Sequence, residues 1–266
     1  MSAILSSERS GHVRVLTINR PAVHNALTTQ LLEEIHQHVA EAESDRATGA
    51  VVITGSGNKA FSAGADLEDL SGLDAFTAHA RMQRGQRALR GVESAEVPVI
   101  AAVNGVALGG GFELVLACTF PVLSTSASLG FPESGLGLMP GYGGTQRLAR
   151  TIGAPSAAFL MLTGSRMDAQ RAHDLGLSPV PPVPPSDLLT EALDIARTIS
   201  GQGPAAVQRI LRALEQGRDA PLDTGLALET ALAASTITSE EAAEGIDAFL
   251  NKRSPKFRDG GVDDLR

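Results

Sequence analysis

Over the first two thirds of the chain, short runs of β-branched and apolar residues alternate with segments whose apolar positions repeat at helical spacing. Leu31, Leu32, Ile35 and Val39 show this spacing, and Thr28 or Thr29 before them is a residue type that caps helices well. Further helices are predicted at 75–91, at 112–118 and from 144 onward, and strands at 13–18, 50–54, 97–103, 121–123 and 128–129. Alternation of strand and helix predicts an α/β fold with parallel strands and right-handed crossovers.

A proline-dense connector separates this part from the rest of the chain. Residues 178–186 read Ser-Pro-Val-Pro-Pro-Val-Pro-Pro-Ser. Such a segment has little backbone freedom, and we interpret it as a stiff linker; a proline-rich ligand for a partner domain is the alternative. Beyond it, helices are predicted at 188–200, 204–216, 222–236 and 240–252. We therefore predict two parts, an α/β core over residues 1–185 and a helical region over residues 186–266.

Charge and composition narrow the classes of partner. The 266 residues include 22 Lys and Arg against 30 Asp and Glu, a net charge of −8 without any basic run, so we expect neither nucleic acid nor a membrane surface as a partner. The apolar stretch 97–118 contains Pro98, glycines and Glu113, which favours a buried core over a membrane span. No secretory signal pattern is visible near Met1, and we expect a cytoplasmic protein.

Several familiar motifs are absent or fail their structural test. Residues 55–60 match the GxGxxG/A dinucleotide fingerprint, but the following Phe-Ser-Ala-Gly-Ala-Asp is not a helix pattern. His36 and His38 would point to different faces of a helix, so they cannot share a metal ion, and no metal site is expected. The lone Cys118 excludes an intrachain disulfide and a cysteine zinc cage. The sequence contains neither a P-loop nor a GxSxG nucleophile motif.

Two carboxylates lie in unusually apolar, glycine-rich surroundings. Ten of the 28 glycines fall between Gly105 and Gly144, a stretch that also contains Glu113 and Glu133. A solvated or helix-capping glutamate is the ordinary interpretation for either residue alone. Burial of an ionised carboxylate costs several kcal/mol or raises its pKa. Two such residues are what a general acid–base pair at neutral pH needs.

Exposed backbone amides are expected near these carboxylates. Gly109, Gly110 and Gly111 precede the predicted helix at 112–118, and amides at a helix N-terminus can hold a developing oxyanion. The small-residue turn 61–66 offers a second amide. Because glycine lets a ligand approach the backbone closely, the triplet strengthens the prediction of an oxyanion hole.

Three stretches together resemble the enoyl-CoA hydratase/isomerase (crotonase) superfamily. They are Phe-Ser-Ala-Gly-Ala-Asp at 61–66, Val-Asn-Gly-Val-Ala-Leu-Gly-Gly-Gly-Phe-Glu at 103–113, and Phe-Pro-Glu-Ser-Gly-Leu-Gly-Leu-Met-Pro-Gly-Tyr-Gly-Gly-Thr-Gln-Arg-Leu at 131–148. Segments 19–21, 25–27 and 248–257 also match, so the resemblance runs essentially end to end. It implies a spiral of ββα units with a C-terminal helical trimerisation region, and a homotrimer or a dimer of trimers.

The resemblance also implies roles for individual residues. An acyl-CoA thioester would place its carbonyl on the amides of Ala65 and Gly110, and Glu113 and Glu133 would be the acid–base pair, Glu113 activating water and Glu133 serving C2. The adenine nucleotide of CoA would lie near Ala26 and Leu27 and along Ala63, Ala65, Asp66, Leu67 and Glu68. Lys256 and Phe257 would reach CoA from a neighbouring subunit.

The implied reaction is hydration of a 2-enoyl-CoA to a 3-hydroxyacyl-CoA, without a metal or any cofactor beyond the CoA of the substrate. Alternatives are another reaction of the superfamily, such as isomerisation or a specialised dehydration, and a non-catalytic acyl-CoA binder. The chain departs from the commonest family pattern at Phe112, at Thr119 and in the proline-rich stretch. These departures leave the acyl preference open.

Overall fold

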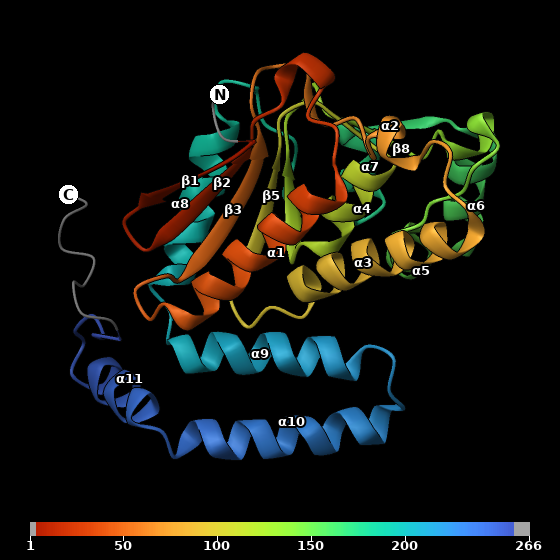
Figure 1. Cartoon of the computed structure of the whole chain (residues 1–266). Helices are drawn as coiled ribbons and strands as arrows, with labels where there is room; N and C mark the ends of the chain where they lie inside the picture. The colour runs from red at the N-terminus through yellow and green to blue at the C-terminus, as the bar shows by residue number, and fades with distance from the viewer. Residues whose placement is uncertain (1–3, 258–266) are drawn as a thin grey trace.

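Two β-sheets form the frame of the computed structural model, which describes residues 4–257 (Figure 1). In the larger sheet, β1 pairs antiparallel with β2 and the other neighbours are parallel. Its strands, in spatial order, are β1 (Leu5–Ser10), β2 (Val13–Ile18), β3 (Ala50–Gly55), β5 (Val99–Val103) and β7 (Phe120–Leu123). The smaller sheet contains β4 (Ala60–Ser62), β6 (Val106–Leu108), β8 (Ser128–Gly130) and the antiparallel edge strand β9 (Arg166–Asp168).

Successive strands alternate between the two sheets and are followed by helices, which makes a spiral of ββα units. β3 and β4 lead to α2 (Leu67–Leu70) and α3 (Ala75–Glu93), and β5 and β6 lead to α4 (Gly110–Ala117). β7 and β8 lead through the 3-10 turn η2 (Glu133–Leu136) to α5 (Gly144–Ile152). The predicted α/β spiral is thus confirmed. The glycine turn after β3 leads to the strand β4 and not to a helix. Residues 55–60 therefore lack the helix that a dinucleotide-binding fingerprint requires.

Alternating residues of the larger sheet face two separate parts of the core. Val51 and Ile53 of β3 face the side covered by α1 (Thr29–Ser44), where the predicted cap is present, since the Thr28 side chain accepts a hydrogen bond from the Leu31 amide at 3.2 Å. Ala50 and Val52 face the other side and pack with Leu188, Ala192 and Ala196 of α8 (Leu188–Ser200). α8 therefore covers the sheet, although it follows residue 185; the division there remains a prediction.

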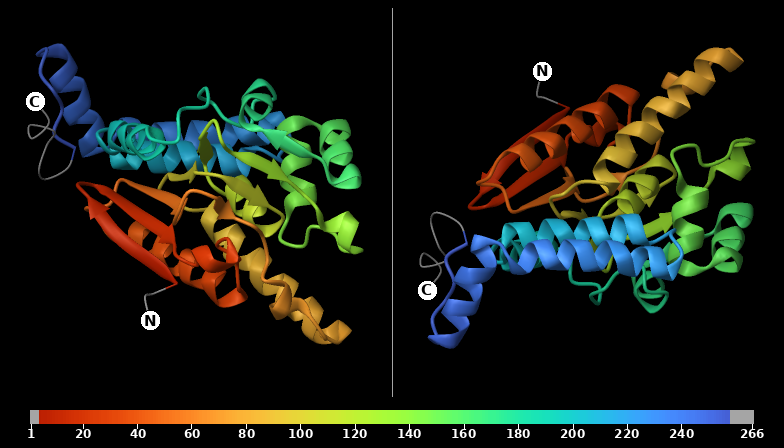
Figure 2. Two further views of the ribbon diagram at one scale, coloured as in Figure 1. Left: turned by 90° about the horizontal axis from the view of Figure 1, so that it is seen from above. Right: turned by 90° about the horizontal axis from the view of Figure 1, so that it is seen from below.

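The remaining helices complete the fold. α6 (Ala154–Thr163) and α7 (Ala169–Asp174) follow α5, and the short turn η1 (Pro21–Val23) precedes α1. α9 (Pro204–Gly217) and α10 (Leu222–Ile237) lie side by side, with α11 (Glu240–Leu250) at their end (Figures 1 and 2). The bounds of α9, α10 and α11 agree with the predicted ones to within two residues at each end. None of the helices between residues 4 and 257 combines the length and apolarity that a membrane span requires.

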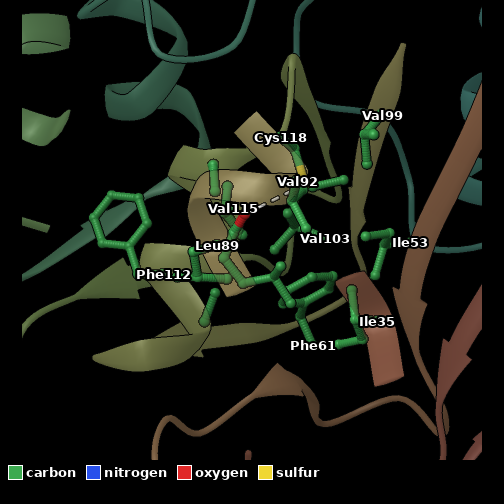
Figure 3. Close-up of a cluster of buried hydrophobic side chains, with 14 of the residues drawn as sticks. Ile35, Ile53, Phe61, Leu89, Val92, Val99, Val103, Phe112, Val115 and Cys118 are labelled. Atoms are coloured by element: carbon green, nitrogen blue, oxygen red, sulfur yellow. Dashed lines mark hydrogen bonds between the residues drawn. The ribbon is translucent and has the colours of Figure 1, made fainter. Parts of the chain in front are cut away.

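Three predicted features acquire a definite structural role. The proline-rich connector crosses the end of β7, where the amide of Val183 donates to the Leu123 carbonyl at 3.0 Å. Cys118 is buried among Val92, Val99 and Val115 at the end of α4 (Figure 3), and burial raises the pKa of its thiol to about 12. Phe112 is fully buried and stacks on Phe131 with ring centroids 4.9 Å apart, so this departure from the family pattern fills core.

Candidate active site

The amide of Ala65 is left free by the pairing of its neighbours. Leu27 and Ala65 form an isolated parallel bridge, in which the Leu27 amide donates to the Gly64 carbonyl at 2.8 Å and the Asp66 amide donates to the Leu27 carbonyl at 2.9 Å. In a parallel bridge the amide of the central residue points away from this neighbour. Gly64 has φ +106°, a conformation that glycine adopts without strain. The chain therefore turns the Ala65 amide toward the start of α4.

Gly110 supplies the second amide. It is the first residue of α4, so its N–H has no acceptor within the helix. A methyl group placed on Gly110 would lie 3.3 Å from the Ala65 nitrogen, so the two amides are close neighbours. The sequence placed all three glycines before the helix, but Gly110 and Gly111 lie within its first turn. Phe112 and Glu113 continue that turn. The glycines let the turn pack closely against β4, since a methyl on Gly111 would lie only 2.4 Å from the Ser62 carbonyl.

Glu113 is a buried carboxylate with one oxygen committed to the backbone. The residue is only 1% exposed, and its Oε1 accepts hydrogen bonds from the amides of Tyr142 at 2.8 Å and Gly144 at 2.7 Å. Burial raises the pKa of Glu113 to about 7, although these two amides act in the opposite direction, and the nearby charge of Glu133 raises it further. The other oxygen has no hydrogen-bond partner within residues 4–257 and is available to a water molecule or a substrate.

Glu133 lies beside the same turn, at the start of η2. A methyl on Gly109 would lie 2.6 Å from Glu133 Oε1, which places this carboxylate against the residue that precedes Gly110. Oε2 is buried and has no hydrogen-bond partner among the described residues. Burial raises the pKa of Glu133 as well. The structure thus brings together all four residues that the sequence suggested for the reaction: two amides and two carboxylates around Gly109 and Gly110.

Tyr142 and Gly144 were missed by the sequence analysis. Their amides hold Glu113, and the Tyr142 ring lies 3.4 Å from the position of a methyl on Gly110. The ring also packs against α3, where a methyl on Gly85 would overlap it. The available signal was that Tyr142 is the one tyrosine of the chain and stands within Gly-Tyr-Gly-Gly.

The segments expected to bind CoA run next to one another. Besides the bridge from Leu27, the Ala63 amide donates to the His24 carbonyl at 2.9 Å. Arg20 joins both segments, since Nη1 donates to the Ala26 carbonyl at 2.6 Å and to Asp66 Oδ2 at 3.0 Å. Asp66 directly precedes α2, and Leu67 and Glu68 in the first turn of that helix are exposed. Their contact with CoA stays a prediction.

Two further predictions concern the ends of the site. Phe257 packs near Gly203 and Gly245 of its own chain, and the Lys256 amide donates to Glu244 Oε1 at 2.8 Å. A contact from these residues to the CoA of a neighbouring subunit stays a prediction. Among residues 4–257, no group of three or more His, Cys, Asp or Glu side chains is arranged to hold a metal ion.

Comparisons with known proteins bear on this geometry. The sequence model described as enoyl-CoA hydratase/isomerase matches residues 8–260. A short-chain-enoyl-CoA hydratase of Clostridium acetobutylicum is 39% identical over 92% of this chain and 94% of its own. The 2,3-dehydroadipyl-CoA hydratase of Escherichia coli K12 is 41% identical over 97% of this chain and 99% of its own.

Solved structures agree with the sequence comparisons. The crystal structure of an enoyl-CoA hydratase from Bacillus anthracis superimposes with a TM-score of 0.91 at 39% identity, covering 96% of this chain and 99% of the other. The resemblance predicted from the sequence motifs is therefore confirmed. The chain belongs to the enoyl-CoA hydratase/isomerase family, the crotonase superfamily, as an enzyme of the enoyl-CoA hydratase type.

Proposed function

We propose that the protein hydrates 2-enoyl-CoA thioesters to 3-hydroxyacyl-CoA with Glu113 and Glu133 as its acid–base pair. The observation that carries this proposal is that the buried Glu113 and the half-buried Glu133, whose Oε2 atom is buried, lie beside the amides of Ala65 and Gly110. A thioester carbonyl that accepts from both amides would place its C2–C3 double bond next to the carboxylates. Relatives named for hydration of short-chain enoyl-CoA and of 2,3-dehydroadipyl-CoA support the reaction class.

Each group has a defined part in the proposed reaction. The two amides stabilise the negative charge that develops on the thioester oxygen, and one such donor is typically worth about 10²–10³ in rate. Glu113, ionised, accepts a proton from water as the oxygen of that water bonds to C3. Glu133, protonated, donates its proton to C2 of the enolate. Glu113 thus gains a proton and Glu133 loses one, and a proton exchange through the product hydroxyl or solvent restores the pair.

Retention of both carboxylates distinguishes this proposal from its alternatives. An isomerase moves a proton between two carbons and needs no second group to activate water. A non-catalytic binder gains nothing from two buried carboxylates, because their burial destabilises the fold. A dehydratase that runs the same steps in reverse shares the whole machinery, so the direction depends on the concentrations of substrate and product.

Turnover of crotonyl-CoA tests the proposal. We expect the wild-type protein to consume it, and Glu113→Gln and Glu133→Gln each to lose about 10²-fold or more in kcat, because general acid–base groups contribute at least that much. Glu8→Gln, which changes an exposed glutamate on β1, is the matched control and should retain the wild-type rate. Near-wild-type rates in both active-site variants would refute the assignment.

We also propose that the chain assembles as a homotrimer or a dimer of trimers. The apolar side chains that remain exposed on α9, α10 and α11 support this, because contiguous exposed apolar surface marks an interaction site. They are Ile210, Leu214, Leu222, Leu226, Ile237, Ile246, Phe249 and Leu250.

A further inference from the structure

The two amides that hold Glu113 belong to a short segment between η2 and α5. Residues 141–143 lie outside any helix or strand, and Gly144 is the first residue of α5. We call residues 141–144 the Tyr142 turn. Because this turn takes part in no sheet, contacts with neighbouring elements have to fix the direction of its amides. The aim of the Glu113 carboxylate therefore depends on what holds the Tyr142 turn.

Arg147 of α5 contacts this turn through its side chain and its backbone. Nη1 of the guanidinium donates to the Tyr142 carbonyl at 2.8 Å, and the Arg147 amide donates to the Gly143 carbonyl at 3.0 Å. Gly143 has φ +112°, and a methyl placed on it would overlap Arg147 Nη1. The guanidinium thus lies directly against the backbone of the turn.

Glu93, the last residue of α3, fixes the guanidinium in turn. Arg147 Nη2 donates to Glu93 Oε2 at 2.9 Å, and each of the two side chains is only 10% exposed. Glu93 also accepts from Arg90 and from Arg218, both at 3.0 Å. Burial favours the protonated form of Glu93, but these arginines outweigh burial and lower its pKa to about 2. Glu93 is therefore ionised at neutral pH and pairs with Arg147 out of contact with most of the solvent.

These contacts form one path from the end of α3 to the candidate base. Glu93 holds Arg147, which in turn holds the Tyr142 carbonyl. The amide of Tyr142 then donates to Glu113 Oε1 at 2.8 Å, and the Gly144 amide donates to the same oxygen at 2.7 Å. A displacement of the guanidinium would therefore disturb both donors of Glu113 together.

The contacts from α3 to the same turn are more exposed or apolar. Gln86 Nε2 donates to the Gly141 carbonyl at 2.9 Å in an exposed contact, and the Tyr142 ring packs on Gly85. Water competes for an exposed hydrogen bond, whereas the charged donor of Arg147 is largely shielded. Arg147 is therefore the strongest polar anchor of the turn.

Arg147 also acts on Glu113 through its charge. Burial and the charge of Glu133 raise the pKa of Glu113, whereas the two amides and the charge of Arg147 lower it. The Tyr142 hydroxyl carries no charge at neutral pH, because burial, with Glu113 nearby, raises its pKa to about 12. Arg147 thus favours the ionised form of Glu113 both through the turn and through space.

From these contacts, and on the basis of the proposed hydration of enoyl-CoA, we infer that Arg147, held by Glu93, is the positioning residue of the catalytic base Glu113. It fixes the Tyr142 turn so that both amides keep one oxygen of Glu113 in place and leave the other directed at water. Arg147 acts through Glu113 and does not touch the substrate.

Arg147→Gln tests this role. Glu93 keeps Arg90 and Arg218 as partners in the variant, so no buried charge is left unpaired and the variant is expected to fold. We expect kcat for crotonyl-CoA to fall by about tenfold to 10²-fold, because misplacement of a catalytic group by about 1 Å costs up to that much. KM should change by less than about twofold, since the contacts that bind the thioester are kept.

The pH profile separates positioning from a merely structural role. The wild-type kcat/KM is expected to rise with pH as Glu113 ionises, and in Arg147→Gln this rise should move to higher pH by about half a unit or more. Loss of folded protein would lower the rate without moving the rise. Arg147→Lys keeps a positive charge and a donor, and should restore part of kcat and return the rise toward its wild-type position. Arg150→Gln, three residues later on α5 and paired with Asp219, is the matched control and should behave as the wild type.

A double variant shows whether Arg147 acts through Glu113. In the Glu113→Gln background, Arg147→Gln should cause no further loss of kcat, because the group that it positions is already disabled. Losses that multiply would overturn the inference. A wild-type pH profile and kcat in Arg147→Gln, or an equal shift in Arg150→Gln, would also overturn it and leave the hydratase proposal intact. Failure of the wild-type protein to hydrate crotonyl-CoA overturns both.

Discussion

At the scale of single residues, the chemistry depends on the balance of forces at Glu113. Burial favours the protonated carboxyl, and the two backbone amides on Oε1 favour the ionised form. Burial has the larger effect, so the pKa of Glu113 is raised to about 7. A carboxylate with that pKa is partly ionised at neutral pH and is a much stronger base than an exposed glutamate.

The rate should therefore depend on pH in the neutral range. Because Glu113 must be ionised to accept a proton from water, kcat/KM for crotonyl-CoA is expected to rise with pH on the acidic side, with an apparent pKa of about 7. At higher pH the rate is expected to fall again, as Glu133, whose pKa is raised by burial, loses the proton that it donates to C2. A stopped assay from pH 5 to pH 9 measures both limbs. The residual activity of Glu113→Gln serves as the control and should not show the acidic limb. A wild-type profile that is flat across this interval would contradict the assigned role.

The same pKa predicts a stability difference. The raised pKa of Glu113 stabilises the folded state below the unfolded value of 4.5, and this contribution is lost as pH rises through about 7. Glu113→Gln keeps an oxygen for the two amides but has no proton to lose. Its free energy of unfolding, relative to the wild type, should increase by about 3 kcal/mol between pH 4.5 and pH 8. Urea titrations at both pH values measure it, and an unchanged difference would mean that Glu113 titrates normally.

At the scale of elements, the start of α4 determines the site. The sequence places a strand, three glycines and a helix in order, and the helix then begins at Gly110, so that one turn carries both the amide of Gly110 and Glu113. Positive φ at Gly109 and Gly64 (48° and 106°) brings this turn and the turn after β4 together. Neither position tolerates a larger residue without strain.

Gly110→Ala tests the oxyanion hole without removing a functional side chain. The new methyl would lie 3.3 Å from the Ala65 nitrogen, where the substrate oxygen is expected. We predict a loss of about 10²–10³ in kcat/KM, as for removal of one oxyanion donor. Stability should change by less than about 1 kcal/mol, the size of the helix-propensity difference. Gly135→Ala in η2, where a methyl meets nothing within 4 Å, is the control. Equal activity of the two variants would contradict the role of Gly110.

Many of the strands and helices were predicted from the sequence, and those that were missed have physical reasons. β2 and α8 were predicted with their observed bounds because their apolar periodicity is regular. β4, β6 and β9 were missed because three residues carry almost no periodic signal, although the equally short β8 was predicted at residues 128–129, and β1 was missed because only Leu5 of its six residues is buried. The amides that hold Glu113 come from residues about 30 positions later, and only the tertiary fold brings them there.

At the scale of the whole molecule, the proposed assembly rests on the exposed apolar side chains of α9, α10 and α11. In the single chain α10 has no buried residue, although most of its side chains are apolar or small. Leu222 of this helix is 76% exposed. Burial of a leucine is worth about 1.5–3 kcal/mol, so several such residues on α9, α10 and α11 would stabilise an interface substantially.

Light scattering tests the assembly. We expect a trimer or hexamer for the wild type, and a smaller species for the double variant Leu222→Glu and Phe249→Glu, because charged groups are costly to bury in an interface. Phe76→Glu, at an equally exposed phenylalanine on α3, is the matched control and should keep the wild-type mass. A monomeric wild type would contradict the proposal.

The central claim is that Glu113 and Glu133 act together in one hydration reaction, and a double-variant cycle tests it most directly. Residues that act as a unit are strongly non-additive, because removal of either disables the same step. We predict that the loss of crotonyl-CoA hydration in the Glu113→Gln, Glu133→Gln double variant is far smaller than the product of the two single losses. Losses that multiply would mean that the carboxylates act independently, and would contradict the account.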